Sequence, residues 1–198
     1  RQIFAAKGRP ADNPLIVHIA EMRALEQVAA IVPPLAEKLA ERFWPGPLTM
    51  ILPKRKEIPE ITSGGLDTVG IRMPSHPVAR ALIQLSGVPI AAPSANISGY
   101  PSPTTAQHVM RDMQGKIAAV VDGGACSVGV ESTVIALEPN GTVRILRPGF
   151  VTKEMLEEVA PEVTLDPAIL HQLQEGQTVR SPGMKYQHYS PRAHVILV

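Results

Sequence analysis

The chain has 198 residues and a mass of 21.2 kDa, which is the size of one domain or of one domain with a tail. Lys and Arg number 19 and Asp and Glu number 18, so the net charge of +1 excludes a strongly basic DNA-coating protein, although not a local basic patch. The single cysteine excludes a disulfide framework and a multi-cysteine zinc site. No apolar run approaches the roughly 20 residues of a membrane span, and no signal peptide opens the sequence, so we expect a reducing cytoplasm and no membrane contact.

Short apolar runs alternate with helical patterns along most of the chain. Residues 15–19 (LIVHI) are typical of a buried strand, whereas Leu35, Leu39 and Phe43 recur at the four-residue spacing of a helix. Pro139-Asn140-Gly141 between two apolar runs is a hairpin signal. The predicted elements are the last turn of a helix at 3–6, a strand at 15–19, helices at 21–30 and from Pro34 to Phe43, strands at 49–52 and 69–72, a helix at 77–86 capped by Gly87, a strand at 89–92, a helix at 105–113, strands at 118–122, 133–137 and 143–146, and a helix that Thr152 caps and that runs to Val159.

This alternation of strands and helices, with a hairpin mixed in, predicts an α/β domain with a twisted, mixed open sheet flanked by helices. The helical pattern at residues 3–6 has no N-cap and no strand before it, so we expect further residues to precede Arg1. Residues 179–195 are polar and turn-rich, which is typical of a linker.

Two cations near the start of the chain, Lys7 and Arg9, are separated by one glycine. On an extended segment they point to the same side. An anion such as a triphosphate gives like charges a reason to converge, and Gly8 permits close backbone approach. The alternative is a solvated basic turn after a helix, whose C-terminus favours cations. Taken alone, this cluster favours the alternative.

A second polar cluster follows the strand predicted at residues 89–92. Ser94 and Asn96 share one face if the segment is extended, and their uncharged polar groups suit phosphate or ribose oxygens. Ligands bind at strand-to-loop junctions in α/β folds. An ordinary turn before a helix N-cap explains the segment equally well. Neither GxxxxGK[ST] nor GxGxxG occurs in the sequence, so the usual nucleotide motifs are absent.

Titratable residues also lie in or beside the apolar strands. Arg72 ends an apolar strand, so it is expected to be paired in a salt bridge or to face a cavity, where it can hold a carboxylate by two parallel hydrogen bonds. His18 lies inside a strand, where a histidine is more often a satisfied core residue than a ligand. Ser132 follows a glycine-rich segment that is either an anion-binding loop or a flexible turn. We expect Cys126 to be an inert small residue, and Arg147 to reach a phosphate from the end of the hairpin.

Six motifs in order resemble those of the YrdC family. They are KGRPADNPLIVH, FWPGPLT, TVGIRMP, PIAAPSANISGYPSPT, VVDGG with VESTV, and ILRPG, and they extend from Lys7 to Gly149. The segment SPGMKYQHYSP resembles the linker of the long, two-domain form of the family. On this resemblance, residues 1–165 form a YrdC-like catalytic domain that is N-terminally incomplete, residues 166–194 an interdomain linker, and residues 195–198 the start of a C-terminal domain.

The resemblance implies a nucleotidyltransferase that forms threonylcarbamoyl-AMP and pyrophosphate from L-threonine, bicarbonate and ATP, with Mg²⁺ sharing the triphosphate charge. Its product serves a tRNA modification, so the implied partners are the transferases that act downstream and either tRNA or double-stranded RNA. Motif positions imply these residues: for catalysis Lys7, Arg9, Ser94 and Asn96; for ATP Arg9, Asn13, Thr68, Ser94, Ser102, Arg147 and Tyr189, with Tyr186 in second place; for threonine His18, Arg72 and Ser132; and for a metal none.

Three alternatives remain open. In the first alternative, the chain as written is catalytically incomplete. In the family, an N-terminal strand and a threonine-contacting segment precede the position of Arg1, and a second domain follows the position of Val198. The second is a non-catalytic module that binds double-stranded RNA or ribosomes, which gives no role to Arg72, His18 and Ser132. The third is a carbamoyl-AMP-forming domain of hydrogenase maturation, which normally adjoins zinc-finger motifs that one cysteine cannot supply.

Overall fold

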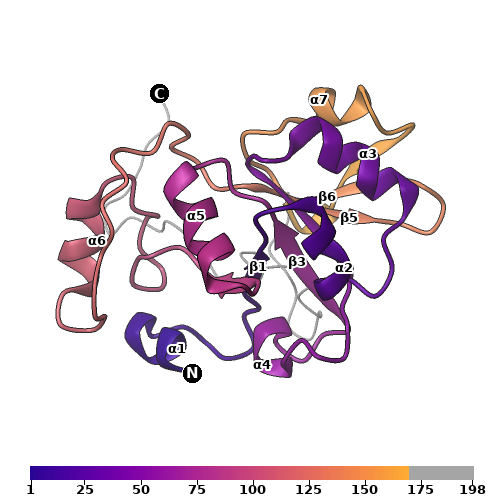
Figure 1. The fold of residues 1–198 in the computed structure, drawn as a ribbon. Coiled ribbons are helices and arrows are strands. Elements are labelled where there is room, and N and C mark those ends of the chain that lie inside the picture. Colours follow the sequence, from indigo (N-terminus) through magenta and orange to yellow (C-terminus); the bar gives the residue numbers. More distant parts are fainter. Residues whose placement is uncertain (170–198) are drawn as a thin grey trace, which may run out of the picture.

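The computed structural model describes residues 1–169, in which one mixed sheet has the strand order β4-β1-β3-β2-β5-β6-β7 (Figure 1). The strands are β1 (Ile16–His18), β2 (Leu48–Pro53), β3 (Thr68–Arg72), β4 (Ile90–Ala92), β5 (Thr133–Leu137), β6 (Val143–Arg147) and β7 (Val163–Leu165). The helices are α1 (Gln2–Lys7), α2 (Leu25–Val28), α3 (Pro34–Phe43), α4 (Glu60–Ser63), α5 (Pro77–Ser86), α6 (Ala106–Met113) and α7 (Lys153–Glu157), with 3-10 turns η1 (Met22–Ala24) and η2 (Pro167–Ile169).

The strand directions bring several chain segments to one end of the sheet. Strand β1 is parallel to β3, and β2 is parallel to β5, whereas β2 is antiparallel to β3 and β5 is antiparallel to β6. Consequently β1, β3 and β6 end where β2 and β5 begin. The predicted α/β fold with a mixed sheet flanked by helices is confirmed.

The main core lies between the sheet and the helices α2 and α3, which Figure 1 shows together with α7 to the right of α5. Helix α3 begins at Pro34, whose fixed φ suits a first turn, and it buries Leu39 and Phe43 as the helical spacing predicts. Leu39 packs with residues of the central strands, including Met50 and Ile71. No helix within residues 1–169 is long and apolar enough to cross a membrane.

Local capping agrees with the sequence signals at three helices. Gly87 ends α5 in the left-handed conformation, with φ of 69°. The Thr105 hydroxyl accepts a hydrogen bond from the His108 amide at the start of α6, and the Thr152 hydroxyl accepts one from the Met155 amide at the start of α7. The hairpin turn is also confirmed, because β5 and β6 pair on either side of Asn140-Gly141.

Three predicted elements need correction, and one strand was missed. The strand predicted at residues 118–122 is wrong, because β4 is the edge of the sheet and no strand pairs with this segment, whose Val121 is 63% exposed. The helix predicted at 21–30 is only a 3-10 turn followed by the single-turn α2, and α7 ends two residues before Val159. Strand β7, which the weak pattern near Leu165 concealed, pairs with β6.

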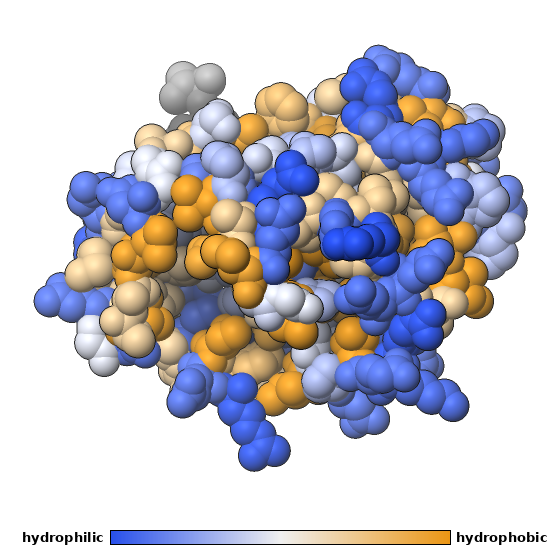
Figure 2. All heavy atoms as spheres, in the orientation of Figure 1, coloured by the Kyte–Doolittle hydropathy of each residue, from blue (hydrophilic) through white to orange (hydrophobic). Residues whose placement is uncertain are grey.

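Truncating Leu39 is expected to test the placement of the core. Leu39→Ala removes a side chain that is 0% exposed, and should lower the free energy of unfolding by about 2–5 kcal/mol through lost burial and a residual cavity. Leu85→Ala on α5 is the matched control, because Leu85 is 86% exposed. Figure 2 shows apolar and polar side chains interspersed on the face of the molecule that is seen in Figure 1. The effect of Leu85→Ala should stay within about 0.5 kcal/mol. Denaturant titration measures both variants, and equal losses would contradict this core.

Candidate active site

Two adjoining cavities share part of their lining. The strand-end cavity lies where β1, β3 and β6 end, and the Lys7 cavity is lined from α1, the loop before β1 and the segment after β4. The strand-end cavity has a volume of about 290 Å³, and the Lys7 cavity has a volume of about 280 Å³. Arg9, Ser94 and Glu131 line both. The strand-end cavity also includes Ile16, His18, Arg72, Ser102, Ser132 and Arg147, and the Lys7 cavity includes Lys7, Gly8, Asn13, Asn96 and Ser98.

Lys7 ties α1 to the segment that follows β4. Its ammonium donates hydrogen bonds to the backbone carbonyls of Ser94 and Asn96, and the residue is only 4% exposed. Burial and, to a lesser extent, the nearby Arg9 lower the pKa of Lys7 to about 8, against the opposing charges of Glu131 and Asp112. The expected proximity of Lys7 to Ser94 and Asn96 is thus observed. The extended geometry predicted for Lys7 and Arg9 is wrong, because Lys7 ends α1 and Gly8 follows it with φ of 61°.

The guanidinium of Arg9 is anchored by the loop that precedes β1. Its Nε donates to the Asn13 carbonyl at 3.1 Å, and its Nη2 donates to the Asn13 Oδ1 at 2.8 Å and to the Pro14 carbonyl at 2.7 Å. These bonds orient Arg9 along the wall shared by the two cavities. Asn13 is buried and acts on Arg9 directly.

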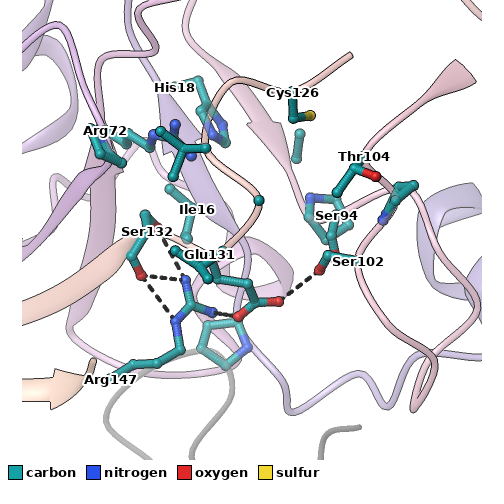
Figure 3. A pocket seen from close by; sticks show the side chains of 18 of the residues that line it. Ile16, His18, Arg72, Ser94, Ser102, Thr104, Cys126, Glu131, Ser132 and Arg147 are labelled. Atoms are coloured by element: carbon teal, nitrogen blue, oxygen red, sulfur yellow. Dashed lines mark hydrogen bonds and ion pairs between the residues drawn. The ribbon is translucent and has the colours of Figure 1, made fainter. Parts of the chain in front are cut away.

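His18 and Arg72 are neighbours because β1 and β3 pair in register at these residues. Figure 3 shows the two side chains together at one side of the strand-end cavity. The Nε of Arg72 donates to the Gly46 carbonyl at 3.0 Å, and no carboxylate among residues 1–169 forms an ion pair with Arg72. The expectation that Arg72 faces a cavity is confirmed, whereas the alternative of a structural salt bridge is not supported in this part of the chain.

The surroundings of His18 and Arg72 disfavour the charged form of each side chain. Burial lowers the pKa of the Arg72 guanidinium, and the positive charge of Arg147 adds to that effect. Burial and, to a lesser extent, Arg72 lower the pKa of His18 to about 4, against the opposing effect of the Ile90 and Ile16 backbone, so the imidazole is neutral near pH 7. The His18 Nδ1 is buried without a hydrogen-bond partner among the described residues.

Ser132 lies under the opposite wall, where β5 begins. Its hydroxyl is 2.9 Å from that of Thr49 and accepts a hydrogen bond from the Arg147 Nη2 at 3.1 Å. The Ser132 carbonyl accepts from both Nε and Nη2 of Arg147, at 3.1 Å and 2.9 Å. A Cβ at Gly149 would lie 2.5 Å from the Thr133 amide nitrogen, so only glycine lets the chain after β6 pass this closely behind Ser132.

Sequence reasoning did not single out one residue of this wall, Glu131. Its Oε2 lies 2.5 Å from the Arg147 Nη1, and its Oε1 accepts a hydrogen bond from the Ser102 hydroxyl at 2.9 Å. The sequence does show a carboxylate between a glycine-rich segment and Ser132, which could have marked Glu131 as a site residue. Its partner Arg147 lies 16 positions away in β6, so the pairing could not be read from neighbouring residues.

One predicted residue, Thr68, lies away from the cavities, and another, Tyr189, lies outside the described residues. Thr68 begins β3 and pairs with Pro53, at the end of the strand opposite Arg72, and it lines neither cavity. Its assignment to ATP remains a prediction without geometric support from these cavities. Tyr189, like Tyr186, lies outside the described residues 1–169.

The pKa of His18 predicts how stability depends on pH. Below pH 6.5 the unfolded chain takes up a proton at this histidine while the folded protein excludes it down to about pH 4, so stability present above pH 6.5 is lost as pH falls through that window. We expect His18→Gln to remove about 1–3 kcal/mol of this dependence. Denaturant unfolding between pH 4 and 7 measures it, with His108→Gln on exposed α6 as the control that should retain the slope. A His18→Gln slope equal to that of the wild type would contradict the burial of the neutral ring.

Two family models match the chain. The family model for Sua5, YciO and YrdC proteins, whose description is "Telomere recombination", matches residues 1–149, and the model described as "Threonylcarbamoyl-AMP synthase, C-terminal domain" matches residues 151–198. Threonylcarbamoyl-AMP synthase of Pyrococcus abyssi is 54% identical over 198 residues, covering 100% of this chain and 57% of the relative. That of Bacillus subtilis is 52% identical over 195 residues, covering 98% and 55%.

Two solved structures share the fold of this chain. The crystal structure of P. abyssi Sua5 complexed with L-threonine superposes with a TM-score of 0.92 at 54% identity, covering 97% of this chain and 56% of that one. The crystal structure of E. coli YciO, at 23% identity and a TM-score of 0.66, shares the fold. This chain thus spans a little more than half the length of the curated relatives above. The family match over residues 1–149 confirms the resemblance that the six motifs carry, and the chain belongs to the Sua5/YciO/YrdC family.

Proposed function

We propose that the protein is a nucleotidyltransferase that forms threonylcarbamoyl-AMP from L-threonine, bicarbonate and ATP. The observation that carries this proposal is the pair of adjoining cavities, of which one contains an arginine without a carboxylate partner and a neutral histidine, and the other contains a buried lysine. Two anionic substrates must meet for this reaction, and each cavity supplies cations for one of them. The names of the relatives and the L-threonine complex of the P. abyssi protein support the same reading.

The strand-end cavity suits the amino acid. Arg72 presents a guanidinium beside the cavity and can hold the threonine carboxylate by charge-assisted hydrogen bonds. His18 is neutral near pH 7, so it can accept or donate a hydrogen bond without repelling the ammonium form of the substrate. Ser132 adds a buried hydroxyl at the opposite wall. The threonine amine would combine with bicarbonate, with loss of water, to give a carbamate.

The Lys7 cavity suits the triphosphate. Lys7 and Arg9 concentrate positive charge there, and Ser94, Asn96 and Asn13 hold those two cations by the hydrogen bonds described above. The carbamate oxygen would attack the α-phosphorus, the bond to the β-phosphate oxygen would break, and pyrophosphate would leave. Cations fixed before the reaction stabilise charge as it moves to the leaving group. Ser102 and Arg147 line the strand-end cavity and contact Glu131, which lines both cavities, so they are placed to contact the nucleotide between these ends.

Mg²⁺ would enter as its complex with ATP. Within residues 1–169 no group of three or more His, Cys, Asp or Glu side chains could hold a metal ion. That composition fits an ion bound mainly by phosphates and water, which is how Mg²⁺ usually accompanies nucleotides. We further infer a cytoplasmic setting, with tRNA-modifying transferases as the consumers of the unstable adenylate.

Pyrophosphate release from ATP, Mg²⁺ and bicarbonate, measured with and without L-threonine, tests the proposed reaction. The protein in its natural full length should release pyrophosphate only when L-threonine is present. Release that L-threonine does not stimulate, together with no calorimetric binding of L-threonine, would overturn the proposal. Binding of double-stranded RNA under those conditions would identify the non-catalytic alternative.

Substituting Arg72 and Lys7 one at a time should affect the two substrates differently. Arg72→Ala should weaken L-threonine binding by about 30- to 4000-fold, because a charge-assisted bidentate contact is worth roughly 2–5 kcal/mol, and should leave ATP binding nearly unchanged. Lys7→Ala should instead lower adenylate formation more than it weakens L-threonine binding. Calorimetric titration and pyrophosphate release measure these effects. A loss of ATP affinity alone in Arg72→Ala would show that the pockets are assigned the wrong way round.

A further inference from the structure

The junction between the two cavities contains a single carboxylate. Among the described residues that line either cavity, Lys7, Arg9, Arg72 and Arg147 are basic and Glu131 is the one acidic side chain. An acidic group is unfavourable beside a site for a triphosphate, because like charges repel. Its presence therefore calls for a role that offsets this repulsion.

The contacts of Glu131 join two walls of the site. One carboxylate oxygen lies 2.5 Å from the Arg147 Nη1 in β6, and the other accepts the Ser102 hydroxyl proton at 2.9 Å, from the loop after β4 (Figure 3). The Ser102 hydroxyl is thereby oriented by Glu131. Arg147 is fixed on its other edge by the Ser132 carbonyl, so Glu131 completes the restraint of the guanidinium.

Resting on the proposed function, we propose that Glu131 is a positioning residue of the adenylation site, which holds Arg147 and Ser102 at the junction of the two cavities and keeps a fixed negative charge facing Lys7. It acts through these three side chains and takes no part in bond making. The expected consequence is unusual for an active-site residue: its charge lowers nucleotide affinity in the ground state, while its contacts raise the rate of the chemical step.

The electrostatics of Lys7 support this role. Glu131 and Asp112 are the two groups whose negative charge raises the pKa of Lys7, against burial and Arg9, which lower it to about 8. Asp112 lies on α6 and accepts a hydrogen bond from the Ile97 amide, so it approaches from a different element. Removing the Glu131 charge would lower the Lys7 pKa further, and less of the lysine would be protonated at pH 8.

Glu131→Gln tests the proposal in the full-length protein, because it keeps the size of the side chain and removes its charge. We expect kcat for pyrophosphate release to fall by about 10- to 100-fold, as for a misplaced contact group. ATP affinity, measured by calorimetry without turnover, should be equal or higher. The alkaline limb of the kcat/KM profile should move to lower pH, since that profile reports groups of the free enzyme.

Glu138→Gln is the matched control. Glu138 also pairs with an arginine of β6, Arg144, at 3.0 Å, its side chain is 24% exposed against 22% for Glu131, and it lines neither cavity. This control should retain wild-type kcat, ATP affinity and pH profile. Glu131→Asp should retain the position of the alkaline limb while losing kcat, because the charge remains but the reach is one methylene shorter.

Two outcomes would overturn the role of Glu131. One is a Glu131→Gln variant whose kcat and alkaline limb match those of Glu138→Gln. The other is a parallel loss of kcat, ATP affinity and thermal stability, which would mark a merely structural residue. Failure of the proposed function is distinct, since the wild type would then lack pyrophosphate release that depends on L-threonine, whereas ATP titrations of Glu131→Gln would still report its charge effect.

Discussion

Concentrated positive charge in two adjoining cavities is the constraint on which the site depends. Lys7, Arg9, Arg72 and Arg147 line these cavities, and burial makes the charges of Lys7 and Arg72 more costly than they would be in water. The protein offsets this cost mainly with fixed dipoles, because carbonyl oxygens accept from the side chains of all four. A carbonyl stabilises a cation without neutralising it, so the field that attracts an anion is retained.

The directions of the strands bring two of these cations, Arg72 and Arg147, together from distant parts of the chain. Arg72 and Arg147 each end a strand, and the antiparallel steps between β3 and β2 and between β5 and β6 bring both ends to the same side. The loop before β5 then lies behind Arg147, where Gly149 permits contact with the backbone of Glu131 and Ser132. A residue with a Cβ at position 149 would force these segments apart, so the geometry of the site depends on a residue without a side chain.

The sequence predicted best those site residues whose positions depend on neighbouring residues in the chain. Arg72 and His18 end short apolar strands, and the Asn140-Gly141 turn brings Arg147 back opposite Val134, so their placement follows from nearby residues. The Lys7 contact with the segment after β4 spans almost 90 positions, and only the family motifs connected the two. Residues 118–122 failed as a strand because strand formation requires a neighbour, which no local pattern reveals.

Glu131 shows why a carboxylate can belong in a site for anions. The positive charge of Arg147 lies near enough to Arg72 to lower the pKa of its guanidinium, so the two groups destabilise each other. A carboxylate paired with Arg147 relieves part of that repulsion and fixes the side chain, whereas Arg72 has no such carboxylate within residues 1–169. In the proposed function this difference assigns the two arginines different roles. Arg72 would hold the substrate carboxylate, and Arg147, already oriented, would meet the nucleotide at a lower entropic cost of ordering.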